Sequence, residues 1–343
     1  MCVDISNLSM ANVKQFIRIC SFNCRSFKNS LPAIHMLCDL HDIILLQEHW
    51  LLPNELGLLS NAYSEYQYSG LSAVDISSDV LVGRPYGGTA ILYRKSLANQ
   101  IRILDSDESR LTGIQINTNS GLLLIGNVYM PTNYGDAASL ELYCDCLAKI
   151  HAAIVDTDAV HTIIAGDFNC SPNSRFYTEF ANFADENNLV MTDLNRLSDT
   201  VTYISDDGSK SSWIDHILCS YSVDTMVGSI EVINDVIISD HRPLSFTVLC
   251  GVADTGSNAN ETHDTDLRVP MWDKCDQDTL ELYAKSLDVL LQQVNIPLWA
   301  VDSSACYLDV DKFYQDILAC ISNAIGLCIP SRRSVVSDYN VKR

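Results

Sequence analysis

The sequence has few basic residues for its length. It contains 22 Lys and Arg against 43 Asp and Glu, which gives a net charge of −21 at pH 7. Nonspecific affinity for DNA grows with the number of basic contacts to phosphate, so this balance predicts weak binding unless basic side chains gather on one face. A metal site would account for only a handful of the acidic residues.

Membrane and secretion signals are also missing. No apolar run reaches the ~20 residues that cross a bilayer, and residues 1–15 have neither the basic nor the apolar segment of a secretory signal. The 13 cysteines are an odd number and form no CxxC pair, which argues against a disulfide framework or a zinc site. These absences predict an intracellular protein of the nucleus or cytoplasm, with reduced thiols and no membrane contact.

Short apolar runs alternate with turns and helical patterns between residues 16 and 249. Continuous runs such as 43–46 and 163–165 are typical of central strands covered on both faces. Residues 138–155 carry apolar side chains at helical spacing. The pattern predicts one α/β domain at 16–249.

The ends of the chain have a different composition. Residues 1–15 form a tail, and residues 250–266 are rich in the Asp, Thr, Asn, Ser and Gly of a linker. Two apolar stripes at helical spacing follow, separated by Pro297. They predict a helical hairpin or connector segment at 267–343.

Polar residues follow several apolar runs directly. Strand ends in a packed sheet are where rigid scaffolds present catalytic groups, so these residues are expected to meet at one rim. Each alone is a weak signal, because a strand-end carboxylate is usually a solvated surface residue. The clusters are Asn23, Gln47-Glu48-His49, Tyr129, Asp167 with Asn169, and Ser239-Asp240-His241.

The order of these clusters resembles the signature of the endonuclease/exonuclease/phosphatase superfamily, which has the DNase-I-like fold. The match covers residues 16–249. It implies a four-layer α/β sandwich of two packed β-sheets flanked by helices, here followed by a C-terminal α-helical segment. The matching elements are Asn23, Gln47-Glu48, Tyr129, Gly166-Asp167-Phe168-Asn169, Ile214-Asp215 and Ser239-Asp240-His241.

Finer features are similar to the apurinic-type endonucleases of non-LTR retrotransposons. Arg25 departs from the DNA-repair relatives, which carry an acidic residue two positions after Asn23, so specialised repair of abasic sites is less expected. The features that fit the retrotransposon type are QEHWL at 47–51, GRPYGGTA at 83–90, VYMP at 128–131 and Thr202-Tyr203 followed by SWID at 212–215.

The resemblance implies a DNA-nicking phosphodiesterase that depends on Mg²⁺ or Mn²⁺. Glu48 would be the central metal ligand, with Asn23 and Asp240 in or near its coordination shell. A hard cation suits oxygen ligands of this kind and can neutralise a phosphodiester.

The remaining catalytic roles also follow from the resemblance. Asp167 would orient or deprotonate the attacking water. Asn169 and Tyr129 would hydrogen-bond the phosphate oxygens. His241, positioned by Asp215, would donate to the phosphate as charge develops.

Other residues leave alternatives open. Asp207-Gly208 predicts a hairpin at 204–211, which either probes DNA or is an ordinary surface turn. His49, His151 and His216 are expected to be structural or surface residues. Trp213 is expected to pack at the core or rim, although it could stack on a base.

Two further functions compete with DNA nicking. A phosphatase of the same fold, acting on a phosphorylated small molecule or lipid, would share the SDHRP segment at 239–243. Such phosphatases carry Arg where this chain has His216, which argues against that function. The second alternative is a retroelement-derived remnant without catalytic activity. The site residues are intact, which argues against this alternative. The C-terminal helices could pair with each other and dock on the nuclease domain, or they could bind a partner such as a reverse-transcriptase domain or another protein.

Overall fold

The computed structural model divides the chain into two compact units, residues 1–259 and 260–343. The predicted tail at 1–15 and the predicted linker at 250–266 lie mostly outside the described residues, and so do positions 83 and 84 of the GRPYGGTA segment. The described residues are 13–14, 16–74, 85–106, 108–253, 268–292, 294, 316–317, 320–321 and 323–333.

The first sheet of the larger unit has the strand order β14-β15-β2-β3-β5-β4. Strands β2 and β3 are parallel, and the other neighbours are antiparallel. In sheet order the strands span Val227–Val232, Leu244–Val248, Ile17–Asn23, Ile43–Gln47, Thr89–Arg94 and Tyr66–Leu71.

The second sheet has the order β10-β13-β9-β8-β7-β6. It repeats the pattern of the first, because only its central strands β8 and β9 are parallel. In sheet order the strands span Leu189–Met191, Asp215–Ser220, His161–Asp167, Gly121–Tyr129, Leu111–Thr118 and Ile101–Ile103.

The two sheets pack face to face around one apolar core. Ile43 and Leu45 of β3 lie in the cluster shared with the second sheet. Their neighbours Ile44 and Leu46 lie in the cluster on the opposite face of the same strand. Alternate residues of a strand point to opposite faces, so a strand covered on both faces must be apolar throughout. This explains the continuous runs in the sequence.

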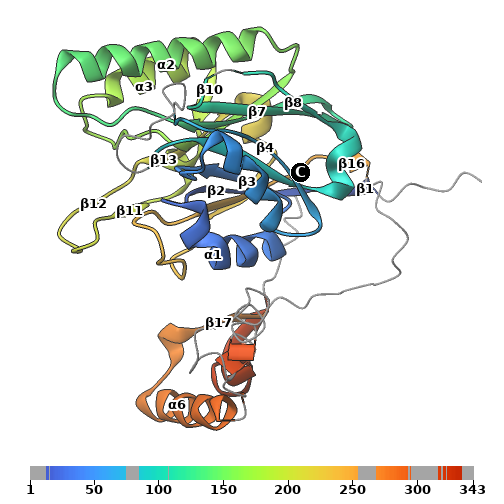
Figure 1. The fold of residues 1–343 in the computed structure, drawn as a ribbon, viewed down its shortest axis with the longest axis vertical. Helices are drawn as coiled ribbons and strands as arrows, with labels where there is room; N and C mark the ends of the chain where they lie inside the picture. Colours follow the sequence, from blue (N-terminus) through green and yellow to red (C-terminus); the bar gives the residue numbers. More distant parts are fainter. Residues whose placement is uncertain are drawn as a thin grey trace, which may run out of the picture. The chain divides into compact units, whose positions relative to one another are not determined.

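Helices cover the outer faces of both sheets, as Figure 1 shows. Helix α1 (Phe27–Leu40) contributes Ile34 and Leu37 to the outer cluster of the first sheet. Helices α2 (Ala137–Val155) and α3 (Tyr177–Glu186) cover the second sheet. The arrangement confirms the four-layer α/β sandwich predicted from the sequence.

Shorter elements complete the larger unit. The hairpin of β11 and β12 confirms the predicted turn, and β1 pairs with β16. Their bounds are Tyr203–Ile204, Ser211–Ser212, Val13–Lys14 and Val252–Ala253. The short helices are α4 at Thr192–Arg196, α5 at Tyr221–Asp224, η1 at Pro53–Asn61 and η2 at Lys95–Gln100.

The smaller unit contains the predicted C-terminal helices. Helix α6 (Gln277–Leu291) matches the first apolar stripe, and residues 323–328 are helical within the second. The Cys328 thiol donates to Ser286 Oγ across 3.2 Å, so the two helices touch. Strands β17 (Arg268–Pro270) and β18 (Ser331–Arg333) also pair here, which the sequence did not indicate. Among the described residues, no helix is long and apolar enough to cross a membrane.

Candidate active site

The parallel strand pairs deliver polar residues to one rim of the sandwich. Asn23 ends β2 beside Gln47 of β3, and Tyr129 ends β8 beside Asp167 of β9. Asp215 begins the antiparallel strand β13 directly opposite Asp167. The expected convergence of strand ends therefore holds for residues from both sheets.

The backbone bends sharply where the strands end. Glu48 and Asn169 have φ of +53° and +48°, the left-handed region that few residues other than glycine adopt. Gly166 has φ of +153°, and a Cβ there would lie 2.0 Å from Val128 O, so only glycine fits. Such backbone strain clusters at functional sites, where the surrounding structure holds it in place.

Gln47 and Glu48 are adjacent in sequence but point in opposite directions. Gln47 is fully buried between the sheets, where its Nε2 donates to Asn127 Oδ1 across 2.6 Å. Glu48 is half-buried at the rim and accepts a hydrogen bond from Trp50 Nε1 at 2.8 Å. Gln47 therefore joins the two sheets, and Glu48 is the member of the pair that faces the site.

Asn23 links carboxylates from the two sheets. Its Nδ2 donates to Asp167 Oδ2 at 2.9 Å and to Glu48 Oε1 at 3.3 Å. Its Oδ1 accepts the backbone N–H of Arg25 at 3.2 Å. One buried amide thus fixes two acidic side chains near each other.

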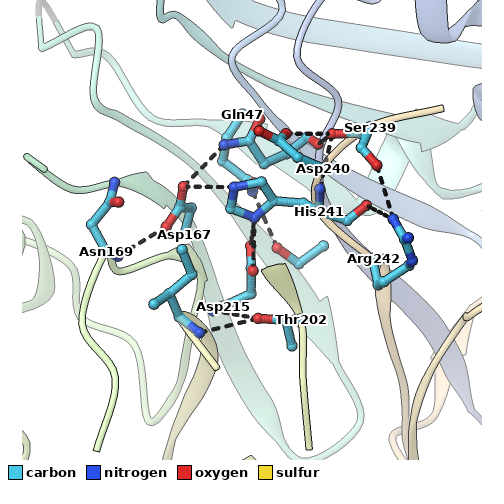
Figure 2. Close-up of polar contacts among 12 residues, drawn as sticks. Gln47, Asp167, Asn169, Thr202, Asp215, Ser239, Asp240, His241 and Arg242 are labelled. Atoms are coloured by element: carbon cyan, nitrogen blue, oxygen red, sulfur yellow. Dashed lines mark hydrogen bonds and ion pairs between the residues drawn. The ribbon is translucent and has the colours of Figure 1, made fainter. Parts of the chain in front are cut away.

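His241 lies between two carboxylates, as Figure 2 shows. Its Nδ1 donates to Asp215 Oδ2 at 2.8 Å, and its Nε2 lies 3.7 Å from Asp167 Oδ2. Burial lowers the pKa of His241, but the charges of Asp215 and Asp167 outweigh burial and raise that pKa to about 10. The ring is therefore an imidazolium at neutral pH.

Asp167 is held by donors on several sides. Besides Asn23, the backbone N–H of Asn169 donates to its Oδ1 at 2.9 Å. Burial raises the pKa of Asp167, against the opposing charge of His241. The side-chain amide of Asn169 is turned toward the backbone, where its Nδ2 donates to Met130 O at 2.8 Å.

Tyr129 lies on the Glu48 side of the site. Burial raises its pKa strongly, and the nearby charges of Glu48 and Asp167 raise it further. The phenol therefore stays protonated and can donate. The Arg110 guanidinium lies over its ring, 5.1 Å from the centroid.

Asp240 reaches the same rim from the segment before β15. Ser239 Oγ donates to Asn23 O at 2.8 Å, which fixes this segment against the end of β2. The distance from Asp240 Oδ2 to Arg25 Nη1 is 3.5 Å. All eight residues predicted for the site thus lie at one end of the sandwich.

The oxygen donors fit a hard divalent cation. Glu48 and Asp240 supply the carboxylate oxygens that Mg²⁺ prefers, whereas Asn23 turns its NH₂ group toward Glu48 and its carbonyl oxygen toward the Arg25 N–H. In the described part of the chain, no lysine or arginine forms an ion pair with Glu48. A bound cation would therefore offset a carboxylate charge that these basic side chains leave uncompensated.

A second group of potential ligand atoms fits a metal less well. Atoms of Asp167, Asp215 and His241 lie within 4.8 Å of one another. However, the charges of Asp215 and Asp167 keep the His241 ring protonated on both nitrogens, and a protonated ring nitrogen cannot bind a metal. The arrangement of these three residues suits proton transfer better than metal binding.

Comparison with known proteins identifies the family. The sequence matches the Endonuclease/Exonuclease/phosphatase family over residues 20–241. The chain belongs to this family. At the level of the superfamily it is therefore a phosphodiesterase. A search of curated proteins gave no match.

Solved structures share the fold at low sequence identity. The catalytic domain of Xenopus laevis APE2 is 18% identical, with a TM-score of 0.56 over 71% of this chain and 94% of that chain. The 3′ phosphatase NExo from Neisseria, bound to product DNA hairpin, is 17% identical, with a TM-score of 0.54 over 67% and 98%. The AP endonuclease LMAP from Leishmania major is 15% identical, with a TM-score of 0.54 over 68% and 88%.

A buried network of hydrogen bonds supports the site, and the sequence analysis did not predict it. Asp193 Oδ2 accepts hydrogen bonds from His216 Nδ1 at 2.8 Å and from Trp213 Nε1 at 2.9 Å. Its Oδ1 accepts from Ile217 N at 2.9 Å. The three donor residues lie on either side of Asp215 in the chain. No motif connects positions 193 and 216, so this pair could not be found from the sequence.

Thr202 is a further supporting residue. Its hydroxyl accepts the backbone N–H of both Ile214 and Asp215 at 3.1 Å, and it is fully buried. Thr202 is part of the sequence resemblance, which implied no role for it. Its hydroxyl fixes the backbone that presents Asp215 to His241 (Figure 2).

The other histidines lie as expected from the sequence. His49 is buried, with its Nε2 2.9 Å from Leu71 O. His216 is buried with Asp193, and His151 is exposed on α2. Because Trp213 donates to Asp193, its indole N–H is engaged with the protein.

Proposed function

We propose that this family member is a divalent-metal-dependent endonuclease that nicks DNA, of the type carried by non-LTR retrotransposons. The observation that carries the proposal is the meeting of Glu48, Asp167 and His241 at one rim. Asn23 connects the first two by hydrogen bonds, and Asp215 orients the third. Phosphodiester hydrolysis needs these three elements: a cation ligand, a base and an acid facing the phosphate.

Asp167 is the proposed base. Burial raises its pKa above that of an ordinary aspartate, so it can accept a proton from water near neutral pH. The water oxygen then attacks phosphorus, and the bond from phosphorus to the leaving nucleotide oxygen breaks. The N–H of Asn169 fixes the orientation of Asp167 during this step.

His241 is the proposed donor to the phosphate. The 3.7 Å between its Nε2 and Asp167 Oδ2 is longer than a hydrogen bond, so the Nε2 proton can reach a phosphate oxygen instead. Asp215 keeps the ring protonated and oriented, which strengthens that bond as negative charge develops. The Tyr129 phenol and the Asn169 amide are proposed to bind other phosphate oxygens.

Glu48 is the proposed central ligand for Mg²⁺ or Mn²⁺, with Asn23 and Asp240 in or near the shell. When bound, such a cation neutralises the phosphate and stabilises the leaving alkoxide. The retrotransposon type is supported by the sequence segments around Glu48, Tyr129 and Asp215, and Arg25 argues against specialised repair of abasic sites. This type also implies a reverse-transcriptase partner for the C-terminal helices.

Nicking of supercoiled plasmid tests the proposal. We expect activity with Mg²⁺ or Mn²⁺ and none with EDTA. Glu48→Ala, Asp167→Ala and His241→Ala should each lose about 10²–10³ in kcat. Glu186→Ala is the matched control, because it removes an exposed carboxylate on α3. Melting temperatures of all variants would separate lost chemistry from lost folding.

A parallel assay would follow phosphate release from inositol polyphosphates. Nicking that persists in EDTA would overturn the metal dependence. Phosphate release without nicking would replace the nuclease with a phosphatase. Full activity of all three site variants would mean that the site lies elsewhere.

A further inference from the structure

Arg25 lies beside the catalytic residues but has no part in the mechanism above. It follows Asn23 by two residues, and its φ of +46° turns the chain away from β2. Its side chain is 33% exposed, and its Nη1 lies 3.5 Å from Asp240 Oδ2. A cation in this place lies within reach of the phosphates that flank the scissile bond.

The guanidinium of Arg25 is occupied by Asp206. Its Nη1 donates to Asp206 Oδ1 at 2.5 Å and its Nη2 to Asp206 Oδ2 at 3.0 Å. This two-pronged geometry is the one in which arginine binds phosphate, because carboxylate and phosphate oxygens match the same fork. Asp206 therefore fills a position that a phosphate group could take.

The hairpin of β11 and β12 carries Asp206 on a firmly attached base. The Ile204 N–H donates to Asp240 O at 2.8 Å, and Tyr203 forms a β-bridge with His241. Asp206 itself lies beyond the paired strands, with 71% of its side chain exposed. Its carboxylate can leave Arg25 by side-chain rotation, without any movement of the catalytic segment.

We propose that Arg25 binds a phosphate of the substrate strand and that Asp206 masks it in the free enzyme. The inference rests on the proposed DNA-nicking function. An incoming phosphate displaces the Asp206 carboxylate, which is an exchange of one anion for another on the same cation. Because the ion pair is partly exposed, its own stability is small and does not prevent the exchange. Asp206 then lowers DNA affinity twice, by competing for Arg25 and by repelling the phosphate.

Binding of a fluorescent duplex, measured by anisotropy, tests the inference. The full chain would carry Asp167→Asn so that DNA remains intact in the presence of Mg²⁺. Adding Asp206→Asn should tighten binding about threefold to tenfold. The slope of log Kd against log salt should steepen by about one phosphate contact.

Asp207→Asn is the matched control. It removes the same charge one residue away, but the Asp207 carboxylate accepts hydrogen bonds from Ser205 and Ser209 within the turn. Its effect should stay below about twofold, the size of a weak screened interaction. Arg25→Gln should weaken binding, and in that background Asp206→Asn should behave like Asp207→Asn.

The outcomes distinguish failure of the proposed function from failure of the proposed masking of Arg25. If the wild-type chain does not nick duplex DNA, or the Asp167→Asn chain does not bind it, the proposed function fails. If both activities are present, but Asp206→Asn matches Asp207→Asn or weakens binding, only the masking of Arg25 fails. A gain that persists after Arg25→Gln would also overturn it, because the effect would then be general electrostatics.

Discussion

The buried pair of Asp193 and His216 should control the stability of the larger unit. Both side chains are fully buried, and Asp193 receives three hydrogen bonds. Asp193→Asn keeps the shape of the side chain but removes its charge and one acceptor oxygen. At least one of the three donors must then face an NH₂ group, and His216 loses its counter-charge.

The expected loss is large. Removing one partner of a buried ion pair costs about 3–5 kcal/mol, because the other partner stays buried and uncompensated. That is a sizeable share of the roughly 5–15 kcal/mol that stabilises a typical domain. Depending on which oxygen the NH₂ group replaces, either Ile217 or Trp213 together with His216 loses its acceptor. Nicking should therefore fall together with stability.

The loss should also depend on pH. Burial lowers the pKa of His216, but the charge of Asp193 outweighs burial and raises that pKa above its ordinary value. The stability from this pair is fully present below the unfolded pKa of about 6.5. It is lost as pH rises through the higher folded pKa. The difference in the free energy of unfolding between wild type and Asp193→Asn should thus be largest in mild acid and small in alkali.

Urea unfolding followed by tryptophan fluorescence, at pH 5.5 to 9, measures this difference. Asp199→Asn is the matched control, since Asp199 is exposed and its φ of +48° suits asparagine. A loss below ~1 kcal/mol at every pH, or a difference that grows in alkali, would contradict the reasoning. Either result would mean that His216 is neutral in the folded protein.

Further predictions concern the site and its surroundings. Asp215→Asn should lower kcat at least about 10²-fold at pH 8. The deficit should shrink toward pH 6, because Asp215 helps to raise the pKa of His241; a deficit independent of pH would leave Asp215 with orientation alone. Replacing residues 206–210 with a short Gly-rich turn should change the pattern of nicks along a duplex, and an unchanged pattern would make the hairpin an ordinary turn. A chain ending at Ala253 keeps the β1–β16 pair and should nick DNA with an unchanged melting temperature; unfolding would show that the smaller unit completes the core.

The central strands and the site could be predicted because two independent constraints act on the same short segments. Burial on both faces requires continuous apolar runs, as in β3 and β9, and these runs stand out in the sequence. Chemistry then requires particular polar residues where the runs end. Glu48 and Asp167 are therefore visible both as breaks in hydrophobicity and as parts of a motif.

The supporting contacts could not be predicted, because they join positions without any local pattern. Asp193 and His216 look like ordinary polar residues, and only the packing of α4 against β13 brings them together. The pair of Arg25 and Asp206 spans 181 positions. Gln47 was grouped with the rim because it adjoins Glu48, although β3 ends at Gln47 and the left-handed φ of Glu48 turns the two side chains apart.

The acidic composition acquires a physical meaning if the chain nicks DNA as proposed. The region 16–249 has 13 Lys and Arg against 28 Asp and Glu, so few phosphates can be contacted and most of the duplex is repelled. With few counterions released, affinity for arbitrary DNA is low. Selection among sites must then come from short-range contacts at the rim, where Arg25 lies 3.5 Å from Asp240 and the β11–β12 hairpin limits access to it. Such an enzyme discriminates among DNA sites because its affinity for most sequences is low. The charge of the hairpin then sets how low that affinity is.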